Sequence, residues 1–249
     1  MNDLLNKNIL ITGSTRGIGK RVATSFAEKG ANIISIGSNP ERLDRIYDQL
    51  IKLNQDGDHL IIQCDLSQLD ESQAKDISLS INEHYKFLDG VIFNAAILGK
   101  MTPLHDYDLL TWRKVINTNL TSQFLLTKAL IPHLKRSNSP KILFTSSGVA
   151  ETGKAYWGAY SVSKFALKGM AEILHQELSS TYGIHVFNFD PGASPTDMRA
   201  EAYPSEDQGN IKSLDDLIPC YEWFFKDITN ANDQHYFKYS DFPLLRNST

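Results

Sequence analysis

The sequence is poor in the features that mark several classes of protein. Only two of its 249 residues are cysteines, Cys64 and Cys220, which is too few for a disulfide framework or a cysteine-type zinc site. No apolar run approaches the roughly 20 residues that cross a bilayer. The 25 basic and 29 acidic residues give a net charge of −4, which argues against a nucleic-acid or anionic-membrane partner held by bulk charge. We therefore expect a cytoplasmic globular protein with neither partner.

Histidine is present but not in metal-binding patterns. The seven histidines show no spacing of the kind that places two ligands on one helix face or turn. We therefore expect no catalytic metal.

Short apolar runs alternate with longer helical stretches along most of the chain. The expected strands are Asn8–Thr12, Asn32–Ile36, His59–Gln63, Leu88–Phe93, Lys141–Thr145 and Gly183–Phe189. The expected helices are Gly17–Lys29, Glu41–Asn54, Glu71–Tyr85, Leu109–Lys135 and Ala155–Tyr182. Alternating strands and crossover helices build a parallel sheet with helices on both faces. This pattern predicts an α/β fold: a doubly wound, Rossmann-like parallel sheet in three α/β/α layers, as a single domain over residues 1–249.

The predicted sheet also locates the ligand site. A doubly wound sheet binds its ligand at the carboxyl ends of the strands, where the strand order reverses. Residues 192–217 are rich in turn-forming and acidic residues. We expect this segment to be a mobile loop over the crevice that contacts the substrate.

A glycine-rich turn follows the first expected strand. Gly13, Gly17 and Gly19 are spaced as G-x-x-x-G-x-G, which allows a tight turn and brings a phosphate close to the N–H groups of the next helix. The pattern differs from the commonest dinucleotide fingerprint, and it lacks the Gly-Lys-Ser/Thr of nucleoside-triphosphatases. A turn without any ligand is the alternative, but a strand before the turn and a helix after it favour a dinucleotide.

This turn resembles the cofactor loop of the short-chain dehydrogenase/reductases, and other motifs of their single-domain subgroup follow in order. Asp65 resembles the acid beside the adenine ring, and Asn94-Ala95 resembles part of the Asn-Asn-Ala-Gly element. Tyr160 lies thirteen residues after Ser147 and four before Lys164. A lone Tyr-x-x-x-Lys pair would mean little, but the ordered set is far more specific.

The resemblance implies roles for individual residues. It implies cofactor binding by Gly13, Ser14, Arg16, Gly17, Ile18, Gly19, Ser38, Asp65, Leu66, Asn94, Ala95, Tyr160, Lys164, Pro191, Gly192 and Thr196. It implies catalytic roles for Asn119, Ser147, Tyr160 and Lys164.

The implied mechanism is consistent with the chemistry of these groups. Tyr160 and Lys164 share one helix face, and a free tyrosine has a pKa of about 10. A nearby ammonium and an oxidised nicotinamide would favour the phenolate, so Tyr160 would exchange a proton with a carbonyl or hydroxyl oxygen. Ser147 would hydrogen-bond that oxygen, Lys164 would hold the ribose, and Asn119 would position a water.

The end of the second expected strand bears on the cofactor. Gly37-Ser38 stands where NAD-preferring folds usually carry an acid, so no carboxylate there repels a 2′-phosphate. Arg16 lies where NADP-preferring relatives often carry a basic residue. We expect NADP(H) in preference to NAD(H).

The sequence departs from the family pattern at several points. Ala96 replaces a glycine beside the cofactor, Ser194-Pro195 alters the segment before Thr196, and the tail around residues 235–241 lacks the usual Gly-Gly. The segment 198–207 is similar to a bacterial branch of oxidoreductases with no assigned substrate. An apolar substrate pocket or simple core packing would equally explain a further set of side chains: Ile97, Leu98, Tyr156, Trp157, Met198 and Tyr203.

The leading hypothesis is an NADP(H)-dependent oxidoreductase that transfers a hydride to or from a small carbonyl or alcohol substrate, with Tyr160 as the general acid/base. One alternative is a 3-oxoacyl-carrier-protein reductase of fatty-acid synthesis, and another is a non-catalytic dinucleotide-sensing protein. By analogy of fold, the helices at 109–135 and 155–182 would form a homodimer or homotetramer.

Overall fold

A parallel sheet forms the centre of the protein. The computed structural model describes residues 3–226 and 234–242. Its strands are β1 (Asn8–Thr12), β2 (Asn32–Gly37), β3 (Leu60–Gln63), β4 (Gly90–Phe93), β5 (Lys141–Thr145), β6 (His185–Asp190) and β7 (Tyr236–Lys238). Their order across the sheet is β3-β2-β1-β4-β5-β6-β7, and every neighbouring pair is parallel.

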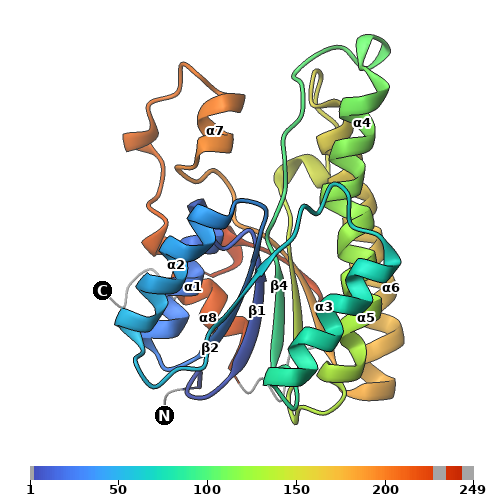
Figure 1. Cartoon of the computed structure of the whole chain (residues 1–249). Coiled ribbons are helices and arrows are strands. Elements are labelled where there is room, and N and C mark those ends of the chain that lie inside the picture. The colour runs from blue at the N-terminus through green and yellow to red at the C-terminus, as the bar shows by residue number, and fades with distance from the viewer. Residues whose placement is uncertain (1–2, 227–233, 243–249) are drawn as a thin grey trace.

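Helices cover both faces of this sheet (Figure 1). On one face lie α1 (Gly17–Glu28), α2 (Pro40–Leu53) and α8 (Ile218–Phe224). On the other lie α3 (Glu71–His84), α4 (Leu109–Ile116), α5 (Ser122–Leu134) and α6 (Gly158–Tyr182). The three-layer, doubly wound α/β fold predicted from the sequence is confirmed.

The apolar strand sequences are explained by burial on both faces. In β1 every residue is buried: Ile9 and Ile11 pack with Phe26 in one core cluster, whereas Leu10 packs with Leu126 in the other. Alternate side chains of a strand point to opposite faces, so a strand between two helical layers carries apolar residues on both faces. Burying each such side chain contributes about 1.5–3 kcal/mol.

The fold collects the carboxyl ends of all the strands at one edge of the sheet. The strand order reverses between β1 and β4, which is where a ligand crevice is expected. The segment predicted to be a loop, 192–217, contains the short helix α7 (Asp197–Ala202) and two 3-10 turns. In Figure 1, α7 stands above this edge of the sheet. Its role in substrate choice and its mobility stay predictions.

Two predicted helices differ from the structure. The helix expected at 109–135 is divided by a π-helical turn at Asn117–Thr121, in which the side chain of Asn119 bonds the backbone of Ile97 in both directions. Such single π turns aim a side chain that an α-helix would place elsewhere. The helix expected from Ala155 begins at Gly158, because Tyr156 has a positive φ angle of 72°, outside the right-handed helical region.

The C-terminal part contains two elements that were not predicted, β7 and α8. Aromatic side chains hold them to the core: Phe237 of β7 meets Phe187 edge-on, with ring centroids 5.9 Å apart, and Phe224 of α8 lies 5.1 Å from the same ring. A strand of three residues is too short to show the alternation of apolar and polar residues that predicts a strand, so β7 and its packing could not be predicted from the sequence. Among the described residues, no helix combines the length and the apolar character needed to cross a bilayer.

Candidate active site

A cavity of about 770 Å³ opens at the carboxyl edge of the sheet. It is lined by residues of the glycine turn, of the carboxyl ends of β2 to β6, and of α6 and α7. Most of the site residues predicted from the sequence line it: Gly13, Arg16, Gly17, Ile18, Ser38, Asp65, Leu66, Asn94, Ala95, Ser147, Tyr160, Lys164, Pro191, Gly192 and Thr196.

Three predicted residues, Ser14, Gly19 and Asn119, lie behind this lining. Ser14 is fully buried, and a Cβ on Gly19 would lie 2.4 Å from the Gly13 carbonyl oxygen and 2.5 Å from Asn94 Nδ2. Asn119 is also fully buried, and its amide bonds Ile97 and Ser163. These residues shape the site from behind.

The glycine turn is fixed to the end of β4 and leaves helix α1 open to a phosphate. Thr12 Oγ1 accepts the backbone N–H groups of Asn94 and Ala95 at 3.0 Å each. Gly13 adopts a left-handed φ of 66°, and a Cβ there would lie 2.9 Å from Ala95 Cα. The first turn of α1 carries no acidic residue and no side-chain cap. Its N–H groups therefore remain available to an anion.

A second arginine joins the end of the cavity near β2. Asn39 caps α2 by accepting the backbone N–H of Arg42 at 2.8 Å, and the Arg42 side chain lines the cavity together with Ser38 and Arg16. Arg42 was not predicted from the sequence, although a basic residue in the first helical turn after the second strand is a signal that could have indicated it. The Arg16 side chain also forms an ion pair with Asp197 of α7, with 3.3 Å between the guanidinium nitrogen and the carboxylate oxygen.

The cavity is basic although the chain is slightly acidic. Six basic side chains line it against three acidic ones. The basic ones are Arg16, Arg42, Lys114, Lys154, Lys164 and Arg199, and the acidic ones are Asp65, Asp190 and Asp197. This local excess suits a polyanionic ligand.

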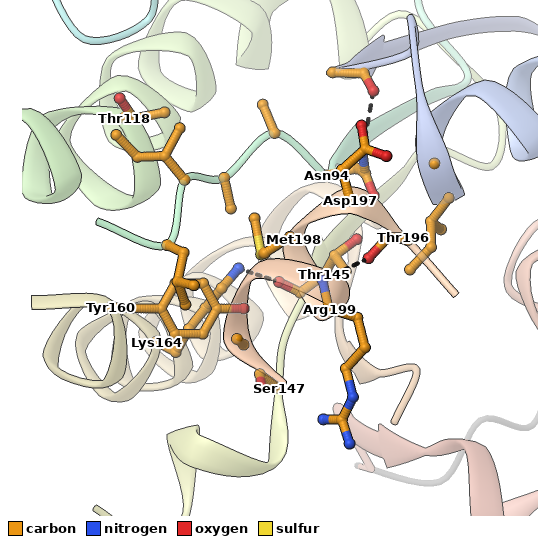
Figure 2. Close-up of a pocket in the computed structure, with 18 of the residues that line it drawn as sticks. Asn94, Thr118, Thr145, Ser147, Tyr160, Lys164, Thr196, Asp197, Met198 and Arg199 are labelled. Carbon is orange, nitrogen blue, oxygen red and sulfur yellow. Dashed lines mark hydrogen bonds between the residues drawn. The ribbon is translucent and has the colours of Figure 1, made fainter. Parts of the chain in front are cut away.

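Tyr160, Lys164 and Ser147 meet deep in the cavity (Figure 2). Tyr160 and Lys164 lie one turn apart on α6, and Ser147 follows the end of β5. Both α6 side chains are buried, and Lys164 Nζ donates to the Thr145 carbonyl oxygen at 2.7 Å. The Lys164 ammonium lies 5.7 Å from the centre of the Tyr160 ring.

Burial dominates the ionisation of this pair. Burial raises the pKa of Tyr160 to about 12, partly offset by a hydrogen bond with Ser147. Burial lowers the pKa of Lys164 to about 8. The protein's own groups thus do not give the lowered tyrosine pKa expected from the sequence, because desolvation outweighs the hydrogen bond with Ser147. At neutral pH the phenol is protonated.

A buried carboxylate at the end of β6, Asp190, was not predicted. Asp190 lines the cavity, and its Oδ1 accepts the backbone N–H of Gly192 at 2.9 Å. Burial raises the pKa of Asp190, and its negative charge acts to raise the pKa of Lys164. Asp190 therefore favours the charged form of the lysine that burial disfavours.

Apolar side chains surround Tyr160 on the side of α7. Leu98, Trp157 and Tyr160 form a small buried cluster, against which Met198 and Tyr203 pack. The predicted apolar pocket is present in part. Tyr156 is an exception: it is 57% exposed and does not line the cavity.

Comparison with known proteins assigns the family. The family model described as short chain dehydrogenase matches residues 7–207. The chain belongs to the short-chain dehydrogenase family. It is therefore an oxidoreductase, of a family that binds a nicotinamide cofactor.

Relatives of this short-chain dehydrogenase include proteins crystallised with a cofactor. The uncharacterized oxidoreductase YciK of Escherichia coli K12 is 36% identical over 226 residues, which are 90% of this chain and 88% of the relative. A Shigella flexneri 2a short chain dehydrogenase complexed with NADP gives a TM-score of 0.91 at 33% identity, covering 96% of this chain and 100% of that one. An Escherichia coli CFT073 short chain dehydrogenase complexed with NADPH gives 0.90 at 34% identity, covering 96% and 99%.

The residues of this short-chain dehydrogenase fit a dinucleotide with a phosphorylated ribose. The start of α1 offers uncapped N–H groups, and two arginines stand where β2 ends without an acid. The described residues contain no group of three or more His, Cys, Asp or Glu side chains that could hold a metal ion.

Proposed function

We propose that this short-chain dehydrogenase is an NADP(H)-dependent oxidoreductase that reduces a small carbonyl compound or oxidises the corresponding alcohol, with Tyr160 as the general acid/base. The observation that carries the proposal is the meeting of Ser147, Tyr160 and Lys164 in the same cavity as the glycine turn.

Different residues along the cavity would hold different parts of the cofactor. The N–H groups at the start of α1 would bind the pyrophosphate, and Asp65 and Leu66 would face the adenine. Lys164 would hold the nicotinamide ribose, and Pro191-Gly192 with Thr196 would hold the nicotinamide. When bound, NADPH supplies the hydride.

The state of Tyr160 favours reduction at neutral pH. Because burial holds the pKa of Tyr160 at about 12, its hydroxyl is protonated and can donate to a carbonyl oxygen. Ser147 hydrogen-bonds the same oxygen and orients the carbonyl. Lys164, whose pKa is about 8, is mostly charged at pH 7 and stabilises negative charge that develops on Tyr160.

The preference for NADP(H) rests on charge at the end of β2. A 2′-phosphate there would meet Arg42 and Arg16 and no carboxylate from Gly37 or Ser38. The NADP and NADPH complexes of the two structural relatives support the same choice.

Apolar side chains exposed on α5 and α6 support a homodimer or homotetramer. Phe124, Phe165 and Ile173 are 52%, 43% and 58% exposed. Covering them with a second copy would bury apolar surface that a monomer leaves in water. We also propose a cytoplasmic location, where Cys64 and Cys220, which form no disulfide, would stay reduced.

A cofactor-consumption screen tests the proposed function. Wild type and Tyr160→Phe are mixed with NADPH and a panel of ketones, quinones, sugars and acyl thioesters, and NADPH absorbance is followed. We expect turnover of at least one carbonyl class by wild type, and a loss of about 10²–10⁴-fold in the variant, with NADPH affinity kept. Tight NADPH binding without turnover of any class would favour the dinucleotide sensor. Turnover of acyl-carrier thioesters alone would favour the 3-oxoacyl reductase.

A further inference from the structure

The cavity contains a cation that the cofactor site does not use. Arg16 and Arg42 stand at the glycine turn and at the start of α2, on the cofactor side. Lys154 instead lies in the loop between β5 and α6, with its Nζ 5.7 Å from the centre of the Trp157 ring. It lines the same cavity beside the catalytic tyrosine.

Lys154 also reaches Tyr203, the residue that follows helix α7 and lines the same cavity. Its Nζ donates to the Tyr203 hydroxyl at 2.6 Å and lies 4.8 Å from the centre of the Tyr203 ring. Arg199 stacks on the same ring, with its guanidinium carbon 3.7 Å from the centre. Two cations thus meet one aromatic side chain at the entrance.

Only one of these two cations is already neutralised. Arg199 makes two hydrogen bonds to Glu206, each 2.5 Å long, so that pair carries no net charge. Among the residues that the structure describes, Lys154 has no carboxylate partner. One unbalanced positive charge therefore remains at the entrance, and it matches a monoanion better than a doubly charged phosphate.

The apolar cluster lies between this charge and the reacting group. The centre of the Trp157 ring lies 5.7 Å from Lys154 Nζ and 5.7 Å from the centre of the Tyr160 ring. The distance from Lys154 Nζ to the centre of the Tyr160 ring is therefore no greater than the sum of these two distances. A ligand that reached both ends would pass Leu98 and Trp157, which are 4% and 8% exposed. Such a ligand has a carbonyl at one end, an apolar body and an anion at the other.

We propose that the substrate is a carbonyl compound with an apolar body and a carboxylate, and that Lys154 binds this carboxylate at the entrance of the cavity. The proposal rests on the proposed function, because it assumes that the carbonyl reacts at Tyr160. It makes Lys154 a determinant of specificity.

The test compares a charged and a neutral probe of similar shape. The dissociation constants of 4-acetylbenzoate and its methyl ester are measured by calorimetry, with and without NADP⁺, for wild type and variants. We expect wild type to bind the acid about fivefold more tightly than the ester, which is the upper range for a partly exposed ion pair. Lys154→Gln should bring the ratio of the two constants close to one, and Lys154→Arg should restore it.

Two further variants separate charge from structure. Lys100→Gln removes an exposed lysine that pairs with Asp108 outside the cavity, and the ratio should stay as in wild type. Tyr203→Phe removes the hydrogen bond between Lys154 and α7 but keeps the charge, so the preference for the acid should persist. Higher salt should lower the ratio in wild type, because exposed charges are screened.

Several results would overturn the proposal. Equal binding of acid and ester by wild type would refute it, as would an unchanged ratio in Lys154→Gln. Equal weakening of both probes by Lys154→Gln and by Tyr203→Phe would show that the lysine only fastens α7. If neither probe nor any other carbonyl is reduced while the acid still binds through Lys154, the proposed function fails and the anion site stands.

Discussion

Replacing Arg42 by alanine tests the predicted cofactor preference. Arg16 already forms an ion pair with Asp197 at 3.3 Å, and the Arg16 side chain is 53% exposed. Arg42 lines the same end of the cavity and has no carboxylate partner among the described residues. A 2′-phosphate would therefore gain most from Arg42.

The size of the effect follows from the strength of such bonds. A hydrogen bond to a charged group contributes about 1.5–3 kcal/mol, and the exposure of Arg42 places the effect at the lower end. Because about 1.4 kcal/mol is a factor of ten, we expect Arg42→Ala to weaken NADP⁺ about tenfold. NAD⁺ lacks the 2′-phosphate, so its affinity should change little.

Calorimetric titration with both cofactors measures this difference. Arg45→Ala is the matched control, because Arg45 lies on the same helix, pairs with Glu41 and does not line the cavity. It should leave both affinities as in wild type. Equal weakening of NADP⁺ and NAD⁺ by Arg42→Ala would refute the reasoning, as would tighter binding of NAD⁺ than NADP⁺ by wild type.

Two other variants test a carboxylate in the cavity wall and an amide behind it. Asp190→Asn removes a negative charge that favours the ammonium form of Lys164, whose pKa burial has lowered to about 8. Because the pKa of Lys164 should fall further, the alkaline decrease of kcat/KM for reduction should move to lower pH. An unchanged pH profile would contradict this role of Asp190. Asn119→Ala leaves the backbone N–H and carbonyl of Ile97 without their side-chain partner. It should lower the free energy of unfolding, measured in urea, by about 3 kcal/mol. A decrease below about 1 kcal/mol would mean that the π turn does not depend on this amide.

Local sequence predicted most of the sheet because its strands are buried on both faces. The three central residues of β1 are apolar and Gly13 follows the strand, so both its extent and the turn after it can be read directly. The edge strand β7 has three residues and depends on Phe237 packing against Phe187, a contact between distant parts of the chain. No local pattern encodes such a contact.

The same distinction holds in the site. Ser147, Tyr160 and Lys164 could be named because their spacing is a family motif. Asp190 and Lys154 have no motif: each acquires its environment only when β6 and the loop before α6 meet at the cavity. The raised pKa of Tyr160 is also a property of burial, which a sequence spacing does not report.

The most direct test of the account follows the hydride itself. NADPH carrying deuterium at both C4 positions of the nicotinamide is reacted in ordinary water with the carbonyl compound that the screen identifies, and the alcohol is analysed by mass spectrometry. The account predicts one deuterium on the former carbonyl carbon with wild type, and almost no alcohol with Tyr160→Phe although NADPH binds as before. An alcohol without deuterium, or near-normal turnover by Tyr160→Phe, would contradict it.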